Sequence, residues 1–143
     1  MSGGQTNHQK LKNVFEEYRS YLASIKDVLP EKIVEFEAEY SLHDSKIKKI
    51  FCSFKNKEVI LEFLGWNLNL EHQIYYTLIF SGVTKFKQTL PQQEYVESEL
   101  GDLGYWEIES INSEIEVRML FASGAEFNIT FKEFSFITKN IKA

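Results

Sequence analysis

The chain has 143 residues and a formal net charge of −5, a length at which one domain buries roughly two thirds of its unfolded surface without disulfides. Hydrophobic residues make up 43% of the chain and charged residues 26%, which excludes an intrinsically disordered protein. The negative charge disfavours binding to nucleic acids and anionic membranes, because like charges repel.

The single cysteine, Cys52, excludes an intrachain disulfide. The first residues are polar and contain no apolar stretch of the secretory type. We therefore expect a cytoplasmic protein.

A helical pattern follows a flexible N-terminus at residues 1–6. Residues 7–41 are predicted to form a helical lead in which Pro30 ends a first helix or opens a second, shorter one. Apolar residues spaced three and four apart define one face of the first helix: Leu11, Val14, Phe15, Tyr18, Tyr21, Leu22, Ile25, Val28 and Leu29.

The second helical segment carries four acidic residues, Glu31, Glu35, Glu37 and Glu39. Such a run is typical of a solvated helix face. The alternative is an acidic docking surface for a basic protein partner.

The segment Leu42-His43-Asp44-Ser45 marks the change from helical to strand periodicity. Short polar side chains such as Asp44 and Ser45 bond nearby backbone groups, which favours a turn. The His43-Asp44 pair also suggests a binding site, and Tyr76 and Trp106 are candidate aromatic walls for it. With three histidines in the chain and no further ligand spacing, we expect no metal, no cofactor and no catalytic residue.

Residues 45–137 alternate apolar and polar side chains and are predicted to form an antiparallel β region. Ser81-Gly82 indicates a bend or bulge before an extended segment that ends at Leu90, and the alternation slips at Lys132-Glu133, which indicates a second bulge. A polar insert follows Pro91, with a helical turn expected at residues 95–100. The main strand candidates are Lys46–Phe54, Glu58–Leu64, His72–Phe80, Tyr105–Ile111, Glu114–Phe121 and Phe127–Phe136.

These patterns predict a single α+β domain spanning residues 1–143. An N-terminal helical pair packs on a mostly antiparallel sheet of about six strands, arranged as a meander or an open roll. Short links between the strands favour antiparallel pairing, and no segment of crossover length separates two strands as a parallel sheet would require.

Several short segments resemble a family of uncharacterised bacterial proteins. In that family a helical lead with a Leu-Pro step, here Leu29-Pro30, runs into Leu-His-Asp-(Ser/Ala), here residues 42–45. Residues 78–83 resemble its F-x-G-V strand end, and residues 126–131 resemble its last strand. The resemblance implies a cytoplasmic bacterial protein with no known catalysis. A looser likeness in fold and composition connects the chain to immunity proteins that accompany bacterial toxins.

Two functional hypotheses follow. The first is a non-enzymatic protein-interaction module, of an immunity-type or regulatory kind, with a basic protein as the expected partner and neither nucleic acid nor membrane. The second is a small-ligand-binding protein or an enzyme with a pocket near His43 and Asp44. The oligomeric state is left open.

Overall fold

The computed structural model describes residues 7–90 and 101–141, with side chains from residue 16 onward. The predicted flexible segment 1–6 and the helical turn expected at 95–100 lie outside the described residues. Within the described residues, no helix is long and apolar enough to cross a membrane.

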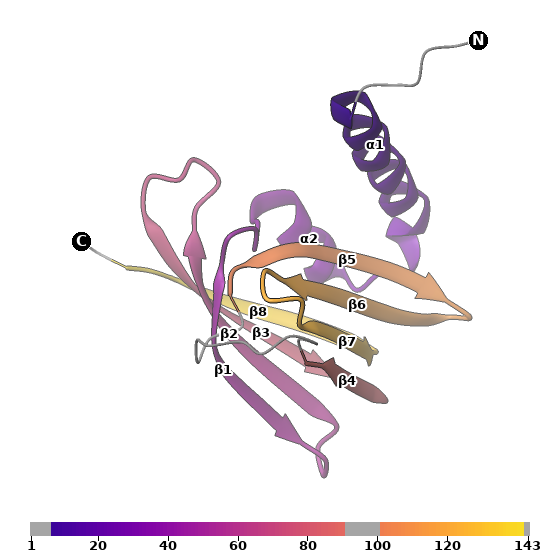
Figure 1. The fold of residues 1–143 in the computed structure, drawn as a ribbon. Coiled ribbons are helices and arrows are strands. Elements are labelled where there is room, and N and C mark those ends of the chain that lie inside the picture. The colour runs from indigo at the N-terminus through magenta and orange to yellow at the C-terminus, as the bar shows by residue number, and fades with distance from the viewer. Residues whose placement is uncertain (1–6, 91–100, 142–143) are drawn as a thin grey trace.

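The predicted helical pair is confirmed, and Pro30 separates its two members (Figure 1). Helix α1 (Asn7–Ile25) continues into a short 3-10 turn, η1 (Lys26–Val28), and α2 spans Glu31–Glu39. The Pro30 carbonyl accepts the first hydrogen bond of α2, from the backbone N–H of Ile33 at 3.0 Å. Helix α2 stops at Tyr40, whose backbone is extended.

The α+β class is also confirmed, and the described residues contain eight strands in two four-stranded sheets (Figure 1). All the pairings are antiparallel, and the sheet orders are β1-β2-β3-β8 and β4-β7-β6-β5. The strands are β1 (Lys46–Ser53), β2 (Glu58–Trp66), β3 (Gln73–Ser81), β4 (Lys85–Thr89), β5 (Leu103–Ile111), β6 (Glu114–Phe121), β7 (Glu126–Phe131) and β8 (Glu133–Asn140).

The two predicted bulges are the places where the chain passes from one sheet to the other. After β3 the chain turns at Gly82, with φ of +63°, and enters β4 in the second sheet. At Lys132 it leaves β7 and joins β3 through β8. The crossings lie against each other, because the Lys132 N–H donates to the Ser81 carbonyl at 3.0 Å. The expected single sheet of about six strands is therefore two sheets of four.

The hydrophobic core lies on the inner faces of the two sheets and is closed at one end by α2. Strands β2 and β3 alternate buried and half-buried residues along their length, which is the period of two expected for a strand with one face inward. Phe36 of α2 is 2% exposed and contacts rings from both sheets, Tyr76 and Phe134 from one and Trp106 from the other.

Helix α1 covers the outer edge of β5, the edge strand of the second sheet. The Tyr18 hydroxyl accepts from the backbone N–H of Ile108 at 2.8 Å, and the Tyr21 hydroxyl accepts from that of Ser110, also at 2.8 Å. Edge strands expose unpaired backbone groups that invite pairing with other chains. Two tyrosines, one helical turn apart, supply acceptors for this edge.

Replacing Tyr21 with phenylalanine is expected to destabilise the protein by about 1 kcal/mol, because the Ser110 N–H loses its acceptor. Urea unfolding measures the loss, and faster amide hydrogen exchange at Ser110 locates it. The matched control is Tyr75→Phe, which removes a hydroxyl bonded to the Glu62 side chain and leaves the backbone of β5 untouched. Equal exchange at Ser110 in both variants would contradict this role of Tyr21.

Candidate functional site

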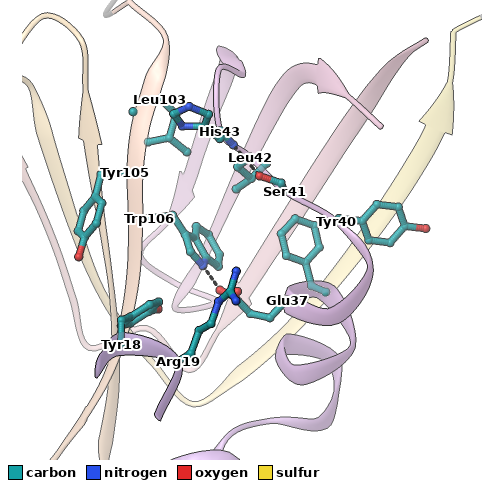
Figure 2. Close-up of a pocket in the computed structure, with 12 residues that line it drawn as sticks. Tyr18, Arg19, Glu37, Tyr40, Ser41, Leu42, His43, Leu103, Tyr105 and Trp106 are labelled. Carbon is teal, nitrogen blue, oxygen red and sulfur yellow. Dashed lines mark hydrogen bonds between the residues drawn. The ribbon is translucent and has the colours of Figure 1, made fainter. Parts of the chain in front are cut away.

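A pocket of about 410 Å³ lies where three segments distant in the sequence meet (Figure 2). Helix α1 contributes Tyr18 and Arg19, the end of α2 and the following loop contribute residues 36–37 and 40–43, and the start of β5 contributes residues 103–106. The isolated antiparallel bridge between Lys46 and Asp102 ties the start of β5 to the start of β1. The pocket is therefore formed by tertiary contacts rather than by one local motif.

The pocket walls are mainly aromatic. Five of the lining residues carry aromatic rings: Tyr18, Phe36, Tyr40, Tyr105 and Trp106. The Phe36 ring lies 5.6 Å from the Tyr40 ring and 5.8 Å from the Trp106 ring, measured between centroids. Mostly apolar walls with a few polar groups are the usual composition of a ligand pocket.

Glu37 places a carboxylate among these rings. Its side chain accepts a hydrogen bond from the indole N–H of Trp106, a bond that links α2 to β5 (Figure 2). Burial raises the pKa of the Glu37 carboxyl above its ordinary value, and the Trp106 hydrogen bond opposes part of that rise because it stabilises the charged form.

The pH dependence of stability is expected to carry a contribution from Glu37. A folded-state pKa raised above the unfolded value means that ionisation disfavours the fold. This cost is absent below the ordinary glutamate pKa of about 4.3 and is complete once the pH exceeds the raised value. Glu37→Gln removes the charge and keeps an oxygen for Trp106. Its stability relative to wild type should therefore increase from acid to neutral pH.

Urea unfolding at a series of pH values measures this effect, with Glu39→Gln, a change at an exposed position of the same helix, as the control. A Glu37→Gln difference that stays constant with pH would contradict the assigned environment of the carboxyl.

Tyr18 reports the electrostatic potential at the α1 side of the pocket. The pKa of its hydroxyl is raised, first by burial and then by the negative charges of Glu37 and Glu107, while its hydrogen bond with the Ile108 N–H acts in the opposite direction. Burial also raises the pKa of Tyr105, Glu107 and Glu109 raise it further, and Arg118 opposes the rise. After burial, the charges that act on these two phenols are mainly those of carboxylates.

His43 lies at the pocket mouth, whereas Asp44 does not line the pocket. The His43 Nε2 is 3.6 Å from the Asp44 Oδ1, and both side chains are about two thirds exposed, at 66% and 63%. Asp44 has φ of +63°, and its backbone N–H donates to the Leu103 carbonyl at 2.9 Å. This residue pair therefore forms the turn that leads into β1 and is hydrogen-bonded to the start of β5.

Ser45 and Tyr76 lie in the interior and do not line the pocket. The Ser45 hydroxyl is fully buried and has no hydrogen-bond partner among the described residues. Tyr76 lies beneath Phe36, and its hydroxyl donates to the Trp66 carbonyl at 2.8 Å. Burial, followed by the effect of Tyr40, raises the pKa of Tyr76 to about 12. Of the five predicted binding or structural residues, the structure brings His43 and Trp106 to one pocket.

The four glutamates of α2 do not share one solvent-exposed face. Glu31 and Glu39 are exposed, and Glu35 forms an ion pair with Lys32 at 3.0 Å. Glu37 turns inward to Trp106. Glu37 was predicted to lie on the acidic face, but helical spacing could have shown that it points inward. Residues of a buried helix face follow the spacing i, i+3, i+4, i+7, as do Ile33, Phe36, Glu37 and Tyr40.

Tyr18 and Arg19 are among the pocket residues that the sequence patterns did not indicate. Tyr18 belonged to the predicted apolar helix face, but no local signal showed which strand it would meet. No group of three or more metal-ligating side chains occurs within the described residues.

The fold and site together define a class: an α+β protein of two open antiparallel sheets with an aromatic pocket where the helices meet the second sheet. The chain belongs to the family described as Protein of unknown function (DUF4085), whose model matches residues 4–133. The predicted membership of an uncharacterised family is thereby confirmed.

The chain is also similar to a solved structure, that of an uncharacterized protein from Neisseria gonorrhoeae. The two sequences are 12% identical, and the structures align with a TM-score of 0.46 over 67% of this chain and 92% of that one. No curated protein matches the sequence.

Proposed function

We propose that this protein is a non-enzymatic binding module and that its recognition site is the pocket between α1, α2 and β5. The observation that carries the proposal is the pocket of about 410 Å³ with five aromatic rings and a half-buried carboxylate. Aromatic side chains bury large areas with few rotatable bonds, so they bind a partner at low entropic cost. An immunity-type or regulatory role is one form of this function, with a protein as the partner.

The polar groups of the pocket support binding rather than catalysis, because several already hold the fold together. The Tyr18 hydroxyl accepts from β5, the Trp106 indole N–H donates to Glu37, and the Ser41 hydroxyl accepts from the His43 N–H at 3.2 Å. The His43 side chain is mostly exposed at the pocket mouth and does not lie in the enclosed part of the pocket. The alternative of a small-ligand-binding protein uses the same pocket.

The proposal is tested by screening a small-molecule and peptide collection while recording the backbone amide NMR signals of the protein. We expect ligands whose shifts cluster at residues 36–43 and 103–106. Tyr105→Ala removes one wall of the pocket and should abolish these shifts. Tyr75→Ala is the matched control, since Tyr75 is also half-buried but contacts Glu62 away from the pocket. An absence of ligands, or shifts that persist in Tyr105→Ala, would refute the proposal.

A further inference from the structure

We infer that the ligand of this pocket is an organic cation, an ammonium or guanidinium group held against the aromatic rings with Glu37 as its counter-charge. The inference rests on the proposed function and specifies the chemistry of its ligand. It follows from the position of Glu37, from the rings around it and from the charges that face the pocket.

Glu37 is a carboxylate without a cationic partner in the part of the chain that the structure describes. Among these residues, the neutral indole of Trp106 donates a hydrogen bond to Glu37. Glu37 is half-buried, and removing a carboxylate from water is costly unless an opposite charge compensates it. A cation entering the pocket would supply that charge, so the binding energy would include relief of a cost already present in the free protein.

The aromatic rings that line the pocket suit the same ligand. The face of an aromatic ring carries a partial negative charge, and tryptophan attracts a cation more strongly than tyrosine or phenylalanine. Trp106 and Tyr40 lie on either side of Phe36, and Tyr18 and Tyr105 complete the lining. Aromatic cages with an adjacent carboxylate recognise alkylammonium and guanidinium groups through two interactions, the attraction of the cation to the ring faces and its pairing with the carboxylate.

The pocket is lined by charges of both signs, with the negative charge of Glu37 inside and the positive charge of Arg19 at an exposed position. Glu37 lies inside and acts with Glu107 on the Tyr18 hydroxyl. Arg19 is exposed, extends from α1 toward the Glu37–Trp106 pair in the view of Figure 2, and is the arginine that lines the pocket. His43 is the second basic group and lies at the mouth. Removing the Arg19 charge should therefore strengthen the binding of a cation and weaken the binding of an anion.

The test uses tryptophan fluorescence in a Trp66→Phe background, which leaves Trp106 as the single tryptophan. The probes have one ring and differ in charge: benzyltrimethylammonium, benzyl alcohol and benzoate. We expect the cation to change Trp106 fluorescence at concentrations where the other two do not. Glu37→Gln should weaken cation binding at least about tenfold, the lower end of the range for a hydrogen bond or contact to a charged group. Arg19→Gln should strengthen it.

The outcomes separate the inference from the proposed function. If benzoate binds and its binding is lost in Arg19→Gln, the inference of a cationic ligand is wrong, but the pocket remains a binding site. Equal binding of all three probes would also overturn it, since charge would then contribute nothing. If no probe binds and the wider screen also finds no pocket ligand, both proposals fail. Circular dichroism of each variant confirms that loss of binding is not loss of fold.

A second pair of probes distinguishes the sources of the cation. N-acetyl-arginine amide represents the side chain alone, and a seven-residue peptide with arginine at its centre represents a protein partner. Tighter binding of the peptide by tenfold or more would assign the site to a basic protein. Equal binding would assign it to a small organic cation. Failure of both, with benzyltrimethylammonium still bound, would restrict the inference to quaternary ammonium groups.

Discussion

Replacing Phe36 with alanine is expected to lower the free energy of unfolding by about 3–5 kcal/mol, the usual cost of removing a buried phenylalanine. The Phe36 ring has contacts with five others, and its centroid lies 5.1 Å from that of Phe136 and 6.0 Å from that of Phe134. Because it also lies between Tyr40 and Trp106, its loss would leave a void beneath the pocket. A small domain is stable by only about 5–15 kcal/mol in total.

Urea unfolding followed by circular dichroism measures the effect of Phe36→Ala. The matched control is Phe51→Ala, because the Phe51 side chain on β1 is 57% exposed and should contribute within about 0.5 kcal/mol. Comparable losses in the two variants would mean that Phe36 is not the centre of the core. If Phe36→Ala lowers the free energy of unfolding but Trp106 fluorescence still responds to the cation probe, then Phe36 contributes to stability and not to ligand binding.

The second large effect is expected at Gly65, at a tightly packed position near the end of β2. A Cβ atom there would overlap the Ser45 hydroxyl and would lie 3.1 Å from the Ser45 Cβ and 3.2 Å from a ring carbon of Tyr76. Overpacking of this kind typically costs about 1–3 kcal/mol. Gly65→Ala should therefore destabilise the protein by about that amount, and urea unfolding measures it.

A double-mutant cycle tests the cause of that loss. Ser45→Gly removes the two Ser45 atoms that the new methyl group would meet, so the combined variant should be more stable than the sum of the single changes predicts. Gly104→Ala is the control, since the nearest atom to its Cβ would be the Leu120 carbonyl oxygen at 3.7 Å. Additive effects of Gly65→Ala and Ser45→Gly would show that the clash is elsewhere.

Ser45→Ala alone is expected to leave stability unchanged or to raise it slightly. The Ser45 hydroxyl is buried without a partner among the described residues, so its removal relieves a desolvation cost and breaks no hydrogen bond seen there. Ser45 belongs to the predicted turn, and its backbone rather than its side chain stabilises the fold there. The Ser45 carbonyl accepts a hydrogen bond from the Leu103 N–H at 2.8 Å. A clear destabilisation in thermal unfolding would contradict this account.

The sequence by itself determined the fold class and most of the secondary structure. The helical spacing up to Tyr40, the break at Pro30 and the alternation of apolar residues in the β region all arise from local periodicity, which any chain with those elements must show. The inward and outward faces of β2 and β3 followed from the same alternation. His43 and Trp106 were also identified as candidates before their positions were known.

Only the tertiary structure decided how these elements combine into two sheets and a pocket. Gly82 and Lys132 mark irregularities in the pattern, but whether a strand bulges or crosses to another sheet depends on which distant strand it pairs with. In the same way, the Glu37 side chain points inward because it bonds Trp106, a partner 69 residues away in the chain. Local periodicity carries no information about such partners, because the packing of whole faces against one another selects them.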